Sequence, residues 1–309
     1  MQWFRVIRTF AVITTMGLFA LMSVSCGSNQ PSSTLPETPT PLSEPSSNSD
    51  EPITAEDLIE RAISKAQAGN LEGAILDYDQ AIELDPDFAG AYNDRGFTKF
   101  QIGDYEGAMA DYNQALQLDS EFVLTYNNRG WLHYQLGDYE AAFSDYDQSI
   151  QLDPNAASTY YTRGLIYANL GDYEAEIAEY TQAIQKDPDF LRAYHNRGIA
   201  RAELEQYEAA IADYTEVIRL DPTFAEAYNN RGFAKHLLGN DKAAIVDLNK
   251  AIQLDPKDAL AYINRGHTKV ELQDTAGAIA DFQVAADSFK AAGATQDYEQ
   301  LLAIIEALE

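Results

Sequence analysis

Asparagine side chains recur at a spacing that could serve recognition of a peptide backbone. Four of them, Asn128, Asn196, Asn230 and Asn264, occupy equivalent positions in segments that we expect to be helical. Asparagine lowers helix stability by roughly 0.6 kcal/mol relative to alanine, so its recurrence there calls for a reason. A carboxamide both donates and accepts hydrogen bonds, and it can therefore pair with a peptide group of any sequence. The alternative is that these side chains cap or bridge neighbouring helices.

The sequence shows no arrangement of residues that predicts catalysis. It contains no nucleophile paired with a base and no glycine-rich loop for phosphate, and its sole cysteine, Cys26, has another explanation at the N-terminus. The histidines His133, His195, His236 and His267 fall in different repeating units and lack metal-ligand spacing. We therefore predict a protein that is not an enzyme and that uses no cofactor, metal or small-molecule substrate.

The charge balance restricts the class of partner. The 309 residues include 49 acidic and 21 basic side chains, which gives a formal charge of −28. Such a surface repels phosphate backbones and anionic lipid head groups. We therefore exclude nucleic acid as a ligand, and we expect basic or neutral protein partners.

An internal repeat of 34 residues runs from residue 55 onward. Arg-Gly pairs recur at this step from Arg95-Gly96 to Arg265-Gly266, and Leu-Asp-Pro or a close variant ends the units, as at Leu84-Asp85-Pro86. We count seven units, which begin at residues 55, 89, 123, 157, 191, 225 and 259. A fixed period of this length predicts stacked helix-turn-helix units.

Each unit is predicted to form two helices. In residues 225–258 the first helix is expected to end at Gly239, which accepts the left-handed conformation, and Asn240 is expected to cap the second helix. Glycines in the middle of first helices, such as Gly96, indicate a close approach of the partner helix through alanines such as Ala108. Large residues on both helices, of which Tyr92 is one, are predicted to fill the core.

The repeat period, the positions of glycine and alanine, and the Asp-Pro stop resemble the tetratricopeptide repeat (TPR) family. The resemblance covers residues 55–292 and implies an all-α, right-handed superhelix, or α-solenoid, of seven repeats. A capping helix is expected over residues 293–309, with Thr295 as its N-cap. Glu176 stands where the family has alanine, which predicts looser packing of the fourth repeat.

Arginine precedes each repeated glycine, where the family more often has leucine, and an acidic residue recurs in each second helix. This pairing predicts a ladder of arginine–carboxylate contacts along the solenoid. Its expected role is structural, and capture of an anion in the groove is the alternative.

In the TPR family the first helices line a concave groove that binds partner segments, and the resemblance implies the same role for defined positions here. The residues at those positions are Asn93, Phe97, Asn127, Asn128, Trp131, Tyr134, Tyr161, His195, Asn196, Asn229, Asn230, Phe233 and Asn264. The asparagine row is similar to the asparagine ladder with which the TPR superhelix of O-GlcNAc transferase grips extended peptides. The aromatic residues would add apolar contact area.

The first 26 residues resemble a bacterial lipoprotein signal peptide. Arg5 and Arg8 precede an uncharged, apolar stretch, and small residues precede Cys26. The resemblance implies lipidation of Cys26. The alternative is a retained membrane anchor, although the 17 uncharged residues fall short of the roughly 20 that span a bilayer. Residues 27–54 contain six prolines and no Lys or Arg, which predicts a disordered tether.

These features together predict a protein–protein interaction scaffold or adaptor, exported and lipid-anchored at a bacterial cell membrane, inner or outer. Two alternatives stay open. One is a self-assembling structural protein, and the other is a non-catalytic subunit of an envelope enzyme complex.

Overall fold

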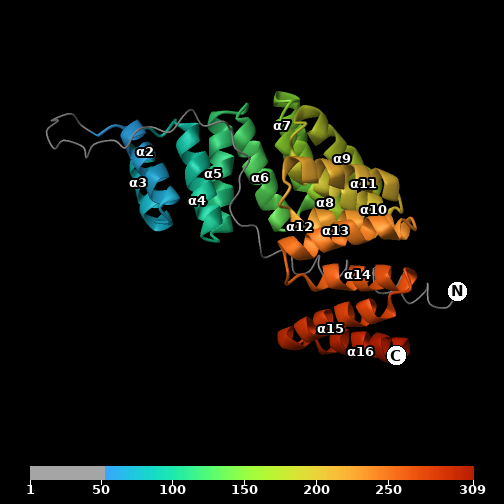
Figure 1. Cartoon of the computed structure of the whole chain (residues 1–309). Helices are drawn as coiled ribbons and strands as arrows, with labels where there is room; N and C mark the ends of the chain where they lie inside the picture. The colour runs from blue at the N-terminus through green and yellow to red at the C-terminus, as the bar shows by residue number, and fades with distance from the viewer. Residues whose placement is uncertain (1–52) are drawn as a thin grey trace. The chain divides into compact units, whose positions relative to one another are not determined.

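The computed structural model describes residues 53–309, and these residues form fifteen helices and no strand (Figure 1). The helices are α2 (Ala55–Gln67), α3 (Leu71–Leu84), α4 (Ala89–Gln101), α5 (Tyr105–Leu118), α6 (Val123–Gln135), α7 (Tyr139–Leu152), α8 (Ala157–Leu170), α9 (Tyr173–Lys186), α10 (Leu191–Glu203), α11 (Tyr207–Leu220), α12 (Ala225–Leu237), α13 (Asp241–Leu254), α14 (Ala259–Glu271), α15 (Thr275–Ala292) and α16 (Thr295–Leu308). The predictions for the signal peptide, Cys26 and nearly all of the tether lie outside the described residues.

Consecutive helices pack as pairs, and the pairs stack on one another. Helices α2 and α3 form the first pair, six further pairs follow along the chain, and α16 packs against α15. Each second helix also contacts the first helix of the next repeat, as α3 contacts α4 (Figure 1). This arrangement confirms the predicted all-α solenoid of seven repeats with a final helix.

In four of the seven repeats the turn between the two helices combines a left-handed glycine with a capping side chain. Gly103 has a φ of 84°, and the Asp104 carboxylate then caps α5 by accepting the N–H of Gly107 at 2.9 Å. Two cap predictions are wrong. Asn240 makes no side-chain cap bond, and Thr295 is the first residue of α16 while Ala294 occupies the cap position.

The turns between repeats each depend on one aspartate. After α3, the Asp85 carboxylate accepts the N–H of Asp87 at 3.2 Å, which forms an Asx turn. The same bond recurs at Asp119, Asp153, Asp187, Asp221 and Asp255. The aspartate therefore closes the turn even after α5, where Ser120 stands in place of proline.

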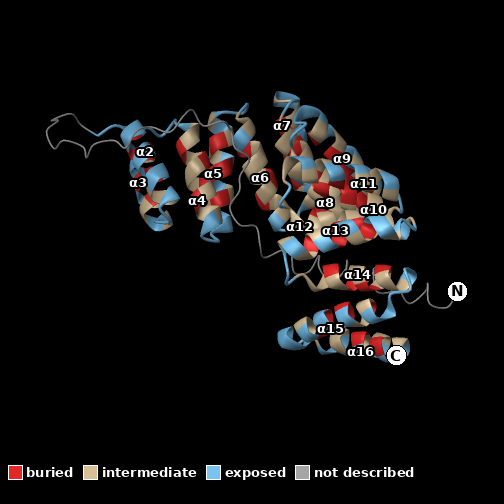
Figure 2. Cartoon of the chain, viewed as in Figure 1, coloured by how far each residue is buried: buried red, intermediate tan, exposed pale blue. Residues whose placement is uncertain are grey.

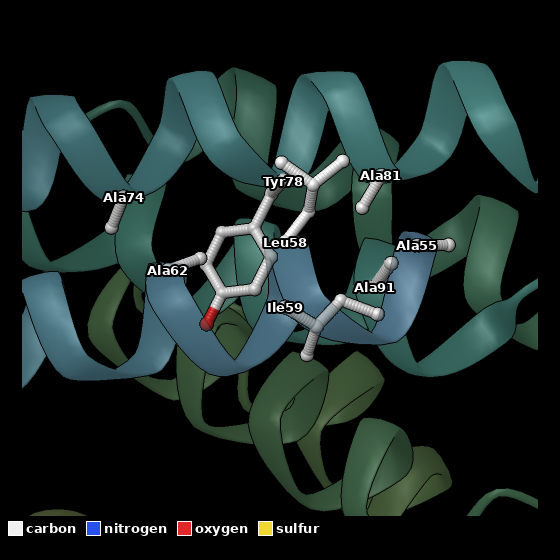
Figure 3. Close-up of a cluster of buried hydrophobic side chains, with 8 residues drawn as sticks. All are labelled: Ala55, Leu58, Ile59, Ala62, Ala74, Tyr78, Ala81 and Ala91. Carbon is white, nitrogen blue, oxygen red and sulfur yellow. The ribbon is translucent and has the colours of Figure 1, made fainter. Parts of the chain in front are cut away.

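In six of the seven repeats the core contains a second-helix ring packed against a small residue of the first helix, and the sixth repeat has Leu248 in place of the ring. Tyr112 is fully buried, and a Cβ added to Gly96 would lie 2.9 Å from its ring. The glycine therefore makes room for an aromatic ring rather than for the alanines that we expected. In the first repeat Ala62 takes the place of this glycine beside Tyr78 (Figure 3). Buried residues lie along the sides where helices face each other (Figure 2).

The first-helix tyrosines lie at the edge of the core and not inside it, contrary to expectation. Tyr92 is half-buried, and the Arg95 guanidinium lies over its ring, 5.4 Å from the centroid. Equivalent pairs join Tyr126, Tyr194, Tyr228 and Tyr262 to the arginine three residues later. These tyrosines thus cover the arginines from solvent.

The predicted arginine–carboxylate ladder is present. Arg95 of α4 donates two hydrogen bonds to Asp111 of α5, at 2.9 and 2.6 Å, and a third to Asp79 of the preceding repeat at 2.7 Å. Bidentate pairs also form in Arg61–Asp77, Arg129–Asp145, Arg197–Asp213, Arg231–Asp247 and Arg265–Asp281. Because most of these arginines also reach the preceding second helix, the ladder stabilises repeats and junctions together.

A second cation, four residues after the arginine, contacts the same aspartate in most repeats. The residues are Lys65, Lys99, Arg201, Lys235 and Lys269. This row of cations was not predicted from the sequence, although it too recurs at the 34-residue step. The fourth repeat deviates, because Glu179 is longer than aspartate and pairs with Arg163 through one oxygen only. Within residues 53–309 the Arg163 Nε and the Glu179 Oε2 have no hydrogen-bond partner.

Two junctions pack less extensively than the rest, α5 with α6 and α7 with α8. At the position of Ala91 the third and fourth repeats have Thr125 and Thr159, whereas the other first helices from α10 onward have alanine. The threonine hydroxyls donate to Asn93 and Asn127 of the preceding repeat, each at 3.0 Å. These hydrogen bonds join first helices, α4 with α6 and α6 with α8, and they add polar contacts at the two junctions where second and first helices pack less extensively.

Glu176 occupies a buried position that holds alanine in the other six repeats. Its side chain is only 4% exposed, and burial raises its pKa to about 8, with nearby Glu203 adding to the rise and a hydrogen bond with Tyr180 opposing it. Helices α8 and α9 still pack as extensively as the other pairs, so the expected loosening of this repeat is not found. The consequence of Glu176 is a buried carboxyl group that holds its proton.

We predict that Arg197→Ala lowers the midpoint of urea denaturation, because the buried carboxylate of Asp213 then keeps only Arg201 as a partner. Such a loss costs about 1–3 kcal/mol. Arg219→Ala is the matched control, since Arg219 is exposed and its ion pairs contribute about 0–1 kcal/mol. Equal midpoints for the two variants would contradict the structural role of the ladder.

We predict a pH-dependent stability that Glu176→Gln removes. The pKa of the Glu176 carboxyl group is 4.5 when it is exposed and about 8 in the folded protein. The contribution of the protonated group to the free energy of unfolding is therefore fully present below pH 4.5 and is lost as the pH rises through 8. Melting followed by circular dichroism at about pH 6 and about pH 9 should show the wild type, but not the variant, losing a few degrees from this group. Parallel pH profiles for the two proteins would show that Glu176 is not the titrating group.

Candidate functional site

The first helices lie on the inner side of the stack. They contact the first helices of neighbouring repeats, α4 with α6, α6 with α8, α10 with α12 and α12 with α14, whereas second helices show no comparable contact with one another in the described part of the chain. Rows that approach closely lie on the concave side of a curved stack. The first helices therefore carry the predicted groove.

Helix α6 shows which side of a first helix stays open. Thr125 and Leu132 are buried on one side, and Arg129 pairs with the second helix α7. Helical periodicity places Leu124, Asn128, Trp131 and Gln135 together on another side. Leu124 is 50% exposed, and the Trp131 ring lies 5.0 Å from that of Tyr134. This open side of α6 is an apolar surface flanked by amide groups.

The asparagines bridge successive repeats. Asn128 donates to the Asn93 oxygen at 3.0 Å, and Asn264 donates to the Asn229 oxygen at 2.9 Å. The bridge recurs between Asn196 and the Tyr161 hydroxyl at 3.2 Å, and the Asn230 amide lies 3.5 Å from the His195 Nε2. In every case the partner stands 35 residues earlier, so each bridge joins two first helices. The geometry therefore favours the bridging interpretation for one N–H of each asparagine, and peptide binding by these side chains stays a prediction.

One of the two predicted rows is largely internal. Asn93 is 1% exposed, and its oxygen accepts bonds from Thr125 and Asn128 while its amide donates to Asp94. His195 and Asn229 are buried as well. In Asn127 the oxygen accepts a bond from Thr159 at 3.0 Å, and Tyr161 packs on Tyr180 and Phe190. The row was placed in the groove by analogy, but here the next repeat covers it.

The aromatic positions remain partly exposed. Phe97, Trp131 and Phe233 are half-buried on equivalent turns of α4, α6 and α12. Tyr134 accepts a hydrogen bond from Asn169 of the next repeat at 2.6 Å. Asn169 was not among the predicted residues, although it also stands 35 positions after its partner. Ile63 of α2 was missed too, and it is 39% exposed at the position equivalent to Phe97.

The histidines have separate local partners and do not form a cluster. His236 Nδ1 lies 2.6 Å from Asp241, and His133 lies 3.9 Å from Asp138. His267 packs edge-on against Phe282, and burial lowers its pKa to about 4. Residues 53–309 contain no group of His, Cys, Asp or Glu side chains arranged to hold a metal ion. None of the helices α2–α16 is long and apolar enough to cross a bilayer.

Family models match the chain in overlapping segments. Models described as TPR repeat or tetratricopeptide repeat match residues 65–103, 98–137, 133–193, 179–212, 200–239 and 225–258. These segments run without a gap from residue 65 to residue 258. No curated protein matches the sequence significantly.

Solved structures show the same fold. YrrB, described as a TPR protein with an unusual peptide-binding site, is 23% identical with a TM-score of 0.52, over 60% of this chain and 95% of its own. MamA is 26% identical with a TM-score of 0.50, and the match covers 55% of this chain and 93% of MamA. The C-terminal part of a TPR repeat-containing protein from Cytophaga hutchinsonii is 17% identical with a TM-score of 0.63, and the match covers 74% of this chain and 93% of that structure. The helix pairs, their 34-residue period and these matches together show that the chain belongs to the tetratricopeptide repeat family.

Proposed function

We propose that this protein is an interaction scaffold that binds a segment of a partner protein on the inner side of its first helices. The observation that carries the proposal is the open side of α6, where Leu124 and Trp131 present apolar surface to solvent. Exposed apolar surface of this kind marks sites of association in soluble proteins. Phe97 and Ile63 extend it toward the N-terminus.

The rigidity of the inner side supports this role. Hydrogen bonds between successive first helices fix the spacing of the exposed side chains along the stack. A surface that is held in place before binding loses less conformational freedom when a partner arrives. The bridging asparagines therefore serve binding by positioning the surface, and the polar groups that the bridges leave free would pair with a peptide backbone.

We also propose that the scaffold acts at a bacterial cell membrane, through a lipid on Cys26. The support is the sequence alone, since a single cysteine follows an apolar segment and precedes a proline-rich stretch. A lipid anchor followed by an extended segment would hold residues 53–309 away from the bilayer. Self-association and service as a subunit of a larger enzyme complex remain alternatives for the same surface.

We predict that Trp131→Ala abolishes or strongly weakens capture of the partner, because buried aromatic anchors contribute about 2 kcal/mol or more at interfaces. The measurement is affinity purification from detergent-solubilised membranes with quantitative mass spectrometry. Ile199→Ala is the matched control, since Ile199 holds the equivalent position in the fifth repeat. A protein that is captured equally by wild type and both variants would place the binding surface elsewhere.

We predict that Cys26 carries a lipid in the mature protein. Cells grown with a fatty-acid analogue should label the wild type and not Cys26→Ala, and mass spectrometry should show a mature chain that begins at residue 26. An unlabelled wild type that keeps Met1 would refute the anchor while leaving the scaffold proposal intact.

A further inference from the structure

The first three repeats combine high acidity with a lack of available cations. Residues 55–156 contain 20 acidic and five basic side chains, a formal charge of −15. All five basic residues are bound within the ladder, namely Arg61, Lys65, Arg95, Lys99 and Arg129. The remaining carboxylates of these repeats therefore have no lysine or arginine of their own repeats to neutralise them.

Two of these carboxylates lie on the inner side of the stack. Glu60 of α2 and Asp94 of α4 occupy the repeat position that Asn128 occupies in the third repeat. Glu60 is exposed and forms no ion pair among the described residues, and Asp94 is half-buried with the Asn93 amide donating to it at 3.0 Å. At this position the inner side thus carries carboxylates in the first two repeats and amides in the third, fifth, sixth and seventh, with Thr162 in the fourth.

Apolar side chains run beside these carboxylates. Ile63, Phe97 and Trp131 hold equivalent positions, three residues after Glu60, Asp94 and Asn128 respectively, and so lie nearly one helical turn further on. The apolar row and the polar row therefore follow the stack in parallel. A ligand lying along the first three repeats would meet two carboxylates and one amide on one flank, and aliphatic or aromatic side chains on the other.

We propose that the first three repeats bind a cationic segment of a partner protein, in which lysine or arginine alternates with large apolar residues. The inference rests on the proposed function and names the chemistry of the ligand. The apolar residues would pack on Phe97 and Trp131, and the cations would pair with Glu60 and Asp94. Charge complementarity of this kind steers association and selects among partners.

The same charge disfavours the other occupants of this surface. A second copy of the chain would bring another acidic face against Glu60 and Asp94, and anionic lipid or nucleic acid would be repelled. A neutral peptide could use the apolar row but would leave Glu60 and Asp94 partly covered and unpaired, which carries a desolvation cost. A cationic segment satisfies both rows at once.

The test begins with selection of peptides from a random-sequence display library on the purified full chain. The expected result is enrichment of peptides with net positive charge and at least one aromatic or large aliphatic residue. The affinity of one such fluorescent peptide, measured by anisotropy, should fall at least tenfold between about 0.05 M and about 0.5 M salt.

Matched variants then locate the contact. Glu60→Lys should lower the affinity for the selected peptide about tenfold. Asp94→Asn, which introduces the residue found at this position in four other repeats, should lower it about threefold. Glu83→Lys is the control, with the same charge change on the exposed side of α3, at a position where the fifth repeat carries Arg219. Its effect should stay within about twofold. Melting of each variant by circular dichroism verifies that the fold is retained.

The outcomes separate this inference from the scaffold proposal. Enrichment of neutral or acidic peptides that lose affinity with Trp131→Ala would overturn the cationic ligand and leave the scaffold intact. Equal weakening by Glu60→Lys and Glu83→Lys would also overturn the inference, because only long-range charge would then be at work. If no selected peptide loses affinity with Trp131→Ala, both the cationic ligand and the scaffold proposal would be overturned.

Discussion

Each repeat buries one carboxylate between its own two helices, and a buried carboxylate is stable only when cations and hydrogen bonds replace its water. Asp111 is held by Arg95 and Lys99, and the same arrangement recurs along most of the array. Because the arginine also reaches the preceding second helix, helix pairing and repeat stacking depend on one interaction. In five repeats a tyrosine covers the arginine, and in six repeats a glycine of the first helix makes room for a large core side chain of the second helix.

The ladder also determines what the outer surface looks like. The ladder binds all five cations of the first three repeats, so the excess acidic charge of these repeats remains on their other carboxylates. The inner side of the first helices lies away from the ladder and carries the exposed aromatic and aliphatic residues. Stability and recognition thus occupy different sides of the same helices, which allows the inner side to vary between repeats without loss of the fold.

The sequence was sufficient for features that depend on one repeat alone. Helix pairs, glycine turns and the arginine–carboxylate pairs follow from residues at fixed separations, and all are present in the structure. It was insufficient where the neighbouring repeat decides the environment. Asn93 is buried because Thr125 and Asn128 of the next repeat contact its amide, and nothing within its own repeat indicates this. The half-burial of Tyr92 was missed for a different reason, since it depends on Arg95 of the same helix, which stacks over the tyrosine ring.

Residues that differ among the repeats distinguish one repeat from another, which the 34-residue period alone does not. Thr125 and Thr159 form hydrogen bonds with the preceding repeat at the two less extensively packed junctions, which flank the third repeat and its Trp131. In a repeat array, stability is approximately a sum of repeat and junction terms, so less extensively packed junctions make this region the easiest to adjust. A surface that must fit an apolar anchor benefits from such adjustment on both sides, while the ladder rung between Arg129 and Asp145 keeps the repeat itself folded. The partly exposed Trp131 and the junctions beside it are therefore parts of one arrangement, in which a rigid repeat lies between two less extensively packed junctions.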